Sequence, residues 1–285
     1  MELLNSPAAA RAYSDAQRAT GHRVALVPTM GALHAGHLAL VDEARKHADI
    51  VVVSIFVNPL QFDVRADFDL YPRPIDDDLA ACDAIGVDAV YAPTAAAMYP
   101  AGFDTHVEPG SLAHGWEGTH RVGHFRGVTT VVAKLLAATR PDVAVFGQKD
   151  AQQLAVIRRM VLDLDLGIDV IGVPTIREPD GLALSSRNTR LTLAERTAAR
   201  CIPSALAAIR HAWHAGERDA ATLIAIGSAT IAAEPMARSE YLAIVDPVTF
   251  ESVAIAGPDA LVVVATWVGD VRLIDNAAVS SPATP

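Results

Sequence analysis

The sequence has 285 residues, a hydrophobic content of 51% and a formal net charge of -10. A chain of this length and composition can bury a substantial core and form one or two domains. Its acidic balance argues against a nucleic-acid partner on electrostatic grounds. The two cysteines, Cys82 and Cys201, exclude a disulfide scaffold at this size, and their apolar surroundings predict reduced core thiols.

The sequence gives no sign of membrane attachment. It has no run of 18 uncharged apolar residues, and its N-terminus lacks the basic and then apolar pattern of a secretory signal. We therefore expect a soluble protein of the cytoplasm, with small-molecule ligands and no membrane partner.

Apolar strands alternate with amphipathic helices over the first part of the chain. The pattern predicts strands at 23–29, 49–58, 87–93, 142–147 and 168–175, with helices at 36–48, 73–86, 124–141 and 150–167. Continuous apolar strands separated by helices indicate a parallel sheet covered on both faces. We expect a doubly wound α/β domain over residues 1–175.

The pattern changes after about Thr175. Residues 192–216 and 218–233 are Ala-rich and predict two helices, and strands are expected at 239–247, 260–269 and 271–276. Helices followed by strands are typical of a smaller α+β domain, here residues 176–285. A loop at this boundary, LSSRN, contains Ser185, Ser186 and Arg187, whose hydroxyls and guanidinium can surround phosphate groups.

The segment PTMGALHAGHLAL, residues 28–40, joins the first predicted strand to the first predicted helix. Ligands of open parallel sheets bind outside the carboxyl ends of the strands. Gly31 and Gly36 allow close approach of the backbone, and a helix that begins near Gly36 offers free N–H groups and a positive dipole end. His34 and His37 add further donors. The segment therefore predicts an anion site, although no classical Gly-rich phosphate loop is present.

The segment FGQKDAQQL, residues 146–154, also follows a strand and opens a helix. Lys149 is a mobile point charge suited to a phosphate or a developing oxyanion. Asp150 suits either a ligand or a helix cap. Of the neutral pair Gln152 and Gln153, we expect one to bind a ligand and the other to be solvated.

Polar residues also follow the second predicted strand. In SIFVNPLQF, Asn58 and Gln61 direct amides toward the same edge of the sheet, although a structural role for either is open. In the next segment, Asp77 lies among helix-start acids and is a candidate to help hold Mg2+ beside a triphosphate. The histidines at 114, 120 and 124 lack a cysteine partner and the spacing of a zinc site, so we expect no zinc there.

Taken together, these segments resemble the pantothenate synthetase (pantoate–β-alanine ligase) family. PTMGALHAGHLALV is similar to that family's version of the H-x-G-H motif of the nucleotidylyltransferase superfamily. FVNPLQF, YPR, HFRGV, FGQKDAQQL and LSSRN then follow in the family's order between residues 22 and 190. Gln148 is a variation, since Glu is also expected there. The resemblance implies a Rossmann-like doubly wound sheet with a smaller α+β domain, which we expect to close over the active site.

The resemblance also implies a reaction in which pantoate and β-alanine condense to pantothenate through a pantoyl adenylate. The reaction would consume ATP and release pyrophosphate and AMP. His37, His34 and Lys149 would be catalytic, with His37 as the candidate proton donor. ATP would be bound by Met30, Gly31, Ala32, Leu33, His34, Ala35, Gly36, His37, Gly147, Gln148, Lys149, Asp150, Ile176, Leu184, Ser185, Ser186 and Arg187. Gln61 and Gln153 would bind pantoate, Gln61 would also contact β-alanine, and Mg2+ would be held mainly by ATP phosphates and by Asp77. A homodimer through the N-terminal domain is expected.

Two other interpretations stay open from the sequence. One is a sister nucleotidylyltransferase that leaves a dinucleotide product. The other is a non-catalytic nucleotide sensor or metal-binding protein on the same sheet. Pantoate-dependent ATP–pyrophosphate exchange distinguishes the ligase from the sister nucleotidylyltransferase. Ligand binding without turnover identifies the sensor or metal-binding protein.

Overall fold

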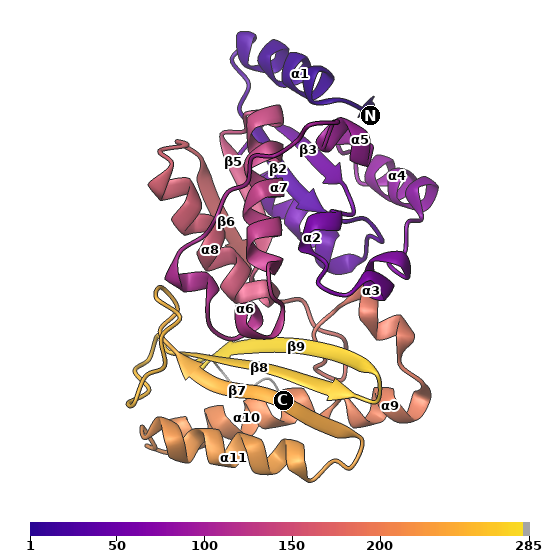
Figure 1. The fold of residues 1–285 in the computed structure, drawn as a ribbon. Helices are drawn as coiled ribbons and strands as arrows, with labels where there is room; N and C mark the ends of the chain where they lie inside the picture. The colour runs from indigo at the N-terminus through magenta and orange to yellow at the C-terminus, as the bar shows by residue number, and fades with distance from the viewer. Residues whose placement is uncertain (282–285) are drawn as a thin grey trace. The chain divides into compact units, whose positions relative to one another are not determined.

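The computed structural model describes residues 1–281, apart from the side chain of Ala66. The chain forms two compact units (Figure 1). Unit 1 comprises Met1–Gln148 and Gln152–Pro174, and unit 2 comprises Lys149–Ala151 and the chain from Thr175 onward.

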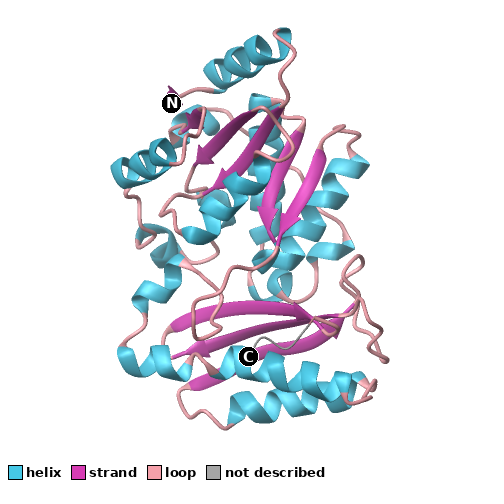
Figure 2. Ribbon diagram, turned by 180° about the vertical axis from the view of Figure 1, so that it is seen from behind, coloured by secondary structure: helices cyan, strands magenta, loops and turns pink. Residues whose placement is uncertain are grey.

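Unit 1 is built on a parallel sheet whose strand order is β1-β4-β3-β2-β5-β6 (Figure 2). The strands are β1 (Glu2–Leu4), β2 (Val24–Thr29), β3 (Ile50–Ile55), β4 (Ala89–Tyr91), β5 (Val143–Gly147) and β6 (Asp169–Val173). From β2 the chain passes to β3 and β4 on one side and later returns to β5 and β6 on the other. The direction of strand addition therefore reverses between β2 and β5.

Helices cover both faces of this sheet. They are α1 (Pro7–Ala19), α2 (Ala35–Ala44), α4 (Ile75–Ala84), α7 (His124–Thr139) and α8 (Ala151–Asp163). Val24 and Leu26 of β2 pack with α1, α7 and α8, whereas Ala25 and Val27 pack with α2 and α4. Since successive side chains of a strand point to opposite faces, a continuous apolar strand needs a helix layer on each side. The predicted doubly wound sheet is confirmed.

Short helices occupy the connections of unit 1. They are η1 (Pro59–Gln61), α3 (Arg65–Asp69), α5 (Ala95–Met98), η2 (Ser111–Ala113) and α6 (Glu117–His120). A further short helix, η3 (Gln148–Asp150), follows β5, and its last two residues belong to unit 2. Strand β1 and helix α1 were not predicted from the sequence. Helix α1 begins with Ser6 as its N-cap and Pro7 in its first turn, and its buried face is made of small residues such as Ala10. The helix is polar on average and buries only small residues, so it lacks the large apolar side chains by which the other helices were predicted.

Unit 2 packs two long helices against an antiparallel sheet. Its helices are η4 (Ser186–Arg190), α9 (Leu193–Ala198), α10 (Cys201–His214) and α11 (Ala220–Ala232), and its strands are β7 (Ala237–Val245), β8 (Leu261–Val268) and β9 (Val271–Ala278) in the order β7-β8-β9. The core contains Ile209 of α10, Leu223 of α11 and Val264 of β8. The predicted α+β architecture is therefore present.

The prediction of a single helix over residues 192–216 is wrong, because the chain breaks between α9 and α10. Pro203 lies in the first turn of α10. Proline has no N–H to donate to the carbonyl four residues earlier, and its ring disfavours a helical residue before it. A proline is tolerated in a first turn, so the helix restarts at Cys201.

The cysteines are not paired with each other. Cys82 is fully buried, and Cys201 is half-buried and packs against the core of unit 2, so both are free thiols at a core, as predicted. Burial raises the pKa of each thiol to about 11. Across residues 1–281, no helix combines the length and the apolar character needed to cross a membrane.

Candidate active site

The carboxyl ends of β2 and β5 mark the point where the strand order of unit 1 reverses. These strands pair directly, with Ala25 opposite Val143 and Leu26 opposite Ala144. Their connections leave toward opposite faces, since α2 and α8 belong to different layers. Ligands bind outside the strand ends at such a point. The residues that follow β2, and Gly147 at the end of β5, were both predicted to bind ATP, and the sheet places them at this edge.

The turn after β2 is held by hydrogen bonds within the protein. Thr29 Oγ1 accepts from Gly31 N at 3.1 Å and donates to Ser54 O at 2.8 Å. Gly31 and Ala32 both adopt positive φ angles, of 80° and 50°. A Cβ at position 31 would lie 2.7 Å from a carboxylate oxygen of Asp78, so the turn requires glycine there.

Asp78 anchors this turn, although it was not among the site residues predicted from the sequence. Its Oδ2 accepts from Ala32 N at 2.9 Å and its Oδ1 accepts from Leu33 N at 2.7 Å. The side chain belongs to α4, and the residue is 3% exposed. The Asp78 carboxylate therefore holds the shape of the turn through the amides of Ala32 and Leu33. Burial of both Asp78 and Cys82, four residues apart on α4, is the helical periodicity that would have revealed this inward-facing carboxylate.

His34 and His37 are oriented by bonds to backbone amides. His34 is the N-cap of α2, where its Nδ1 accepts from Gly36 N at 3.1 Å, and His37 Nδ1 accepts from His34 N at 3.3 Å. The two rings lie 4.1 Å apart between centroids, with a 31° angle between their planes. Because Nδ1 is an acceptor in both rings, the proton of each neutral imidazole resides on Nε2. Both residues therefore present Nε2–H as a donor.

The expectation of free N–H groups at the start of α2 is only partly correct. The amide of Gly36 is taken by the His34 ring, and the amide of His37 donates to His34 O at 2.8 Å. Ala35 and Gly36 begin the helix, whose positive dipole end still favours an anion. The histidine rings thus replace part of the backbone as donors.

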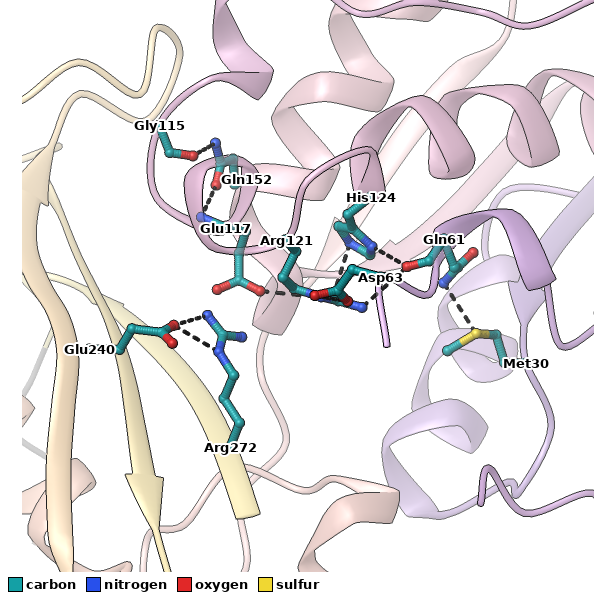
Figure 3. Close-up of polar contacts among 10 residues, drawn as sticks. All are labelled: Met30, Gln61, Asp63, Gly115, Glu117, Arg121, His124, Gln152, Glu240 and Arg272. Atoms are coloured by element: carbon teal, nitrogen blue, oxygen red, sulfur yellow. Dashed lines mark hydrogen bonds and ion pairs between the residues drawn. The ribbon is translucent and has the colours of Figure 1, made fainter. Parts of the chain in front are cut away.

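A second set of polar residues surrounds Gln61 (Figure 3). Gln61 is 8% exposed and ends η1. Its Nε2 donates to Met30 Sδ at 3.1 Å and its Oε1 accepts from Asn58 Nδ2 at 3.0 Å. Asn58 is fully buried and also accepts from Tyr99 OH at 2.7 Å. Gln61 therefore has a fixed orientation, and Asn58 has the structural role that was left open for it.

His124 and Arg121 fix the backbone beneath Gln61. His124 Nδ1 donates to Gln61 O at 2.8 Å, and Arg121 Nη2 donates to the same oxygen at 3.3 Å (Figure 3). Arg121 Nη1 lies 3.2 Å from His124 Nε2. Nδ1 thus carries the proton of His124, and the ring is neutral. In contrast, His114 and His120 are exposed.

The two glutamines of α8 have different environments. Gln152 is 5% exposed, and its amide accepts from Glu117 N at 3.0 Å and donates to Leu112 O and Gly115 O, each at 2.9 Å. Gln153 is half-buried. The expectation that the glutamine without a ligand is solvated is therefore wrong, because Gln152 is buried and holds the 112–117 loop. The prediction that Gln153 binds pantoate stays a prediction.

The remaining candidate residues of unit 1 lie beside β5 and on α4. Gly147 ends β5 with open space around its Cα, and Gln148 Nε2 donates to Gly172 O at 3.3 Å. Asp77 is exposed in the first turn of α4. Among the described residues, no group of three or more His, Cys, Asp or Glu side chains is placed to hold a metal ion.

The candidate residues of unit 2 lie on two segments. Lys149 is half-buried and Asp150 is exposed at the end of η3. Ile176 and Leu184 face each other across a hairpin, in which Leu184 N donates to Ile176 O at 2.9 Å. The hairpin leads directly into Ser185, whose Oγ accepts from Arg187 N at 3.2 Å as the N-cap of η4, the helix that begins with Ser186.

Comparisons with known proteins agree with this arrangement. The model of the family Pantoate-beta-alanine ligase matches residues 2–278. A pantothenate synthetase of Heliobacterium modesticaldum is 50% identical over 276 residues, which cover 97% of this chain and 98% of that protein. The crystal structure of pantothenate synthetase from Thermus thermophilus has a TM-score of 0.93 at 44% identity, covering 99% of this chain and 100% of that one. A Francisella tularensis pantoate-β-alanine ligase, complexed with β-γ ATP and β-alanine, has a TM-score of 0.81 at 31% identity, with 100% of both chains covered.

Proposed function

The chain belongs to the pantoate–β-alanine ligase family, and we propose that the candidate residues described above carry out the family's reaction in it. The resemblance inferred from the sequence is confirmed by the family match over residues 2–278. The enzyme catalyses the ATP-dependent condensation of pantoate with β-alanine through a pantoyl adenylate. The ATP and β-alanine of the related Francisella tularensis complex support both molecules as substrates here.

The reaction has two displacement steps. A carboxylate oxygen of pantoate attacks the α-phosphorus of ATP, the bond to the β-phosphate oxygen breaks, and pyrophosphate leaves. The amine of β-alanine then attacks the acyl carbon, loses a proton, and displaces AMP. The first step needs alignment and neutralisation of phosphate charge more than covalent help from the protein.

The paired histidines are the observation that supports a role in the first step. Backbone amides donate to Nδ1 of both rings, so the protons of the neutral His34 and His37 rings reside on Nε2. In the proposed mechanism these Nε2–H groups donate hydrogen bonds to ATP phosphate oxygens, and that of His37 stabilises the charge that develops on the leaving pyrophosphate. The Lys149 ammonium stabilises charge on the α-phosphate.

The amide of Gln61 supports a role in pantoate binding. One hydrogen of its Nε2 is used on Met30 Sδ, a weak acceptor, and an amide nitrogen has two hydrogens to donate. The proposal assigns the second hydrogen to pantoate. Gln153 completes the pantoate contacts, and Gln61 also contacts the incoming amine. The buried bonds of Asn58 and His124 keep Gln61 from reorienting between the two steps.

The nucleotide contacts complete the proposal. Ile176 binds adenine through its backbone, Gly147, Gln148 and Asp150 lie along the ribose and phosphates, and Leu184, Ser185, Ser186 and Arg187 contact the phosphates. The hairpin bond between Leu184 and Ile176 supports a shared role, because it ties the adenine contact to the phosphate loop.

We assign the protein ligand of Mg2+ to Asp77. Mg2+ usually takes most of its ligands from substrate phosphates and water and only one or two from carboxylates. Both oxygens of Asp78 already accept backbone N–H groups, whereas Asp77 is exposed one residue earlier on α4. When bound, Mg2+ neutralises phosphate charge. Asp77→Asn should therefore raise the Mg2+ concentration that gives half-maximal exchange, and an unchanged requirement would remove Asp77 from the site.

Pantoate-dependent exchange of pyrophosphate into ATP tests the site directly. His37→Ala and Lys149→Ala should each lower the exchange rate by on the order of 10²–10⁴-fold, the effect of losing a hydrogen-bond donor or an electrostatic partner at the developing charge. His114→Ala, at an exposed histidine, is the control and should keep the parental rate. Parental exchange in the His37 or Lys149 variant would remove that residue from the mechanism.

Product analysis tests the reaction itself. Incubation with ATP, pantoate and β-alanine should yield pantothenate and AMP in equal amounts. A dinucleotide product would indicate the sister transferase instead, and binding without turnover would indicate a sensor.

The assembly and cellular location are part of the same proposal. We expect a homodimer through unit 1 in the cytoplasm, as the family resemblance implies. Light scattering on the eluting protein should give about twice the chain mass of 30.0 kDa. A mass equal to one chain would exclude the dimer.

A further inference from the structure

The sheet of unit 2 carries a buried polar pair near the end of β9. The side chain of Asp275 is 1% exposed, and Asn276 is 8% exposed as a residue. Buried polar groups are retained with partners, because an unpartnered one is costly. The residues that Asp275 and Asn276 bind therefore indicate what the pair holds in place.

Asp275 holds the hairpin that contains Ile176. Arg177 donates from Nη1 to Asp275 Oδ2 at 2.6 Å and from Nη2 to Asp275 Oδ1 at 3.0 Å. This two-point contact fixes the orientation of the guanidinium relative to the carboxylate. The same guanidinium donates to Gly181 O at 3.0 Å and to Asn276 O at 3.1 Å. Burial raises the pKa of Asp275, and the Arg177 guanidinium acts against that rise. Arg177 thus spans its own hairpin and β9.

Asn276 holds the turn that contains Lys149. Its Nδ2 donates to Lys149 O at 2.8 Å, across 127 positions of sequence. Its backbone N–H donates to Asp275 Oδ1 at 2.8 Å, so the two side chains of the pair are linked. Lys149 belongs to unit 2, although it follows the last residues of β5 in the sequence. This bond is one of the contacts that place it there.

Two segments with proposed ATP contacts therefore meet at one point of β9. One is the Lys149 turn. The other is the hairpin of Ile176 and Leu184, which continues into the Ser185–Arg187 loop. A shift of either segment by about 1 Å is enough to lower a rate by roughly 100-fold when alignment limits the reaction.

We propose that Asp275 and Asn276 are positioning residues for the adenylate-forming step, which fix the Lys149 turn and the Ile176 hairpin relative to each other. Neither side chain contacts substrate in this proposal. It rests on the proposed contacts of Lys149 and Ile176 with ATP.

The test compares kcat/KM for ATP with KM for pantoate in the exchange assay. Asn276→Leu and Asn276→Asp both remove the donor to Lys149 O. The leucine adds no charge, whereas the aspartate adds a carboxylate. Arg177→Lys removes the two-point contact with Asp275. Each should lower kcat/KM for ATP by on the order of 10–100-fold while KM for pantoate stays within about 2-fold, because Gln61 is held by other bonds.

Asp219→Ala is the matched control for stability. Asp219 caps α11, its Oδ2 accepting from Thr222 N at 2.8 Å, and the change weakens unit 2 away from β9. Its kcat/KM for ATP should equal that of the parent. If the Asn276 variants also keep the parental kcat/KM for ATP while Lys149→Ala abolishes exchange, the positioning role is refuted and the proposed site stands. If Lys149→Ala retains exchange, the proposed site itself is refuted. If Arg177→Lys keeps the parental kcat/KM for ATP, the proposed role of Asp275 in holding the Ile176 hairpin is refuted.

Discussion

The carboxylate of Asp78 should control both the stability of the histidine turn and the rate of adenylate formation. It accepts two backbone N–H bonds, at 2.7 and 2.9 Å, in a residue that is 3% exposed. Hydrogen bonds to a charged group contribute about 1.5–3 kcal/mol each. Asp78→Ala should therefore cost roughly 3–6 kcal/mol of folding free energy, and Asp78→Asn, which keeps one acceptor oxygen, about 1.5–3 kcal/mol.

The kinetic effect follows from the same geometry. Ala32 and Leu33 lie directly before His34, so loss of their anchor displaces the ring that caps α2. We expect Asp78→Asn to lower the rate of pantoate-dependent exchange by on the order of 10²-fold, as is usual when alignment is lost. In hydrogen-exchange measurements the amides of Ala32 and Leu33 should lose protection in this variant.

Asp76→Asn is the matched control for the Asp78 variants. Asp76 is an exposed aspartate in the first turn of the same helix, so the variant removes the same charge from the same helix end. It should keep parental exchange activity and parental protection of the Ala32 and Leu33 amides. If Asp78→Asn behaves like Asp76→Asn in both measurements, the anchoring role of Asp78 is wrong.

Three further predictions follow from individual contacts. Gly127→Ala would press a Cβ against the carbonyl of Leu60; it should displace η1, lower stability by about 1–3 kcal/mol in urea unfolding, and raise KM for pantoate. Although burial opposes it, hydrogen bonding by Arg18 and a backbone amide holds the pKa of Asp142 below its ordinary value. Asp142→Asn should therefore be less stable than the parent at pH 7. The difference in unfolding free energy should vanish as the pH falls below about 4 and through the pKa of Asp142 in the folded protein. Unfolding measured at pH 7 and at pH 3 tests this. The Cys82 thiol, buried and with a pKa of about 11, should resist a thiol reagent at pH 7.5 until the protein is unfolded.

The sequence by itself predicted the doubly wound sheet and the location of the histidine turn. Both depend on short-range patterns. Continuous apolar strands alternating with amphipathic helices permit few arrangements, and a parallel sheet brings the carboxyl ends of its strands to one edge. His34 and His37 follow β2 directly, so their place at that edge required no knowledge of long-range contacts. The resemblance of the motifs added the substrates, which no periodicity encodes.

The partners of these residues depended on contacts between distant parts of the chain. Asp78 lies 46 and 45 positions from the amides that it accepts, and only the packing of α4 against the sheet turned it inward while its neighbours Asp76 and Asp77 stayed exposed. Gln152 and Gln153 are adjacent and chemically identical, but a helix separates successive side chains by about 100°. The 112–117 loop therefore engaged Gln152 alone. Asn276 and Lys149 are 127 positions apart, and no local pattern predicts a bond between a strand side chain and so distant a carbonyl; the tertiary fold alone brought them to 2.8 Å.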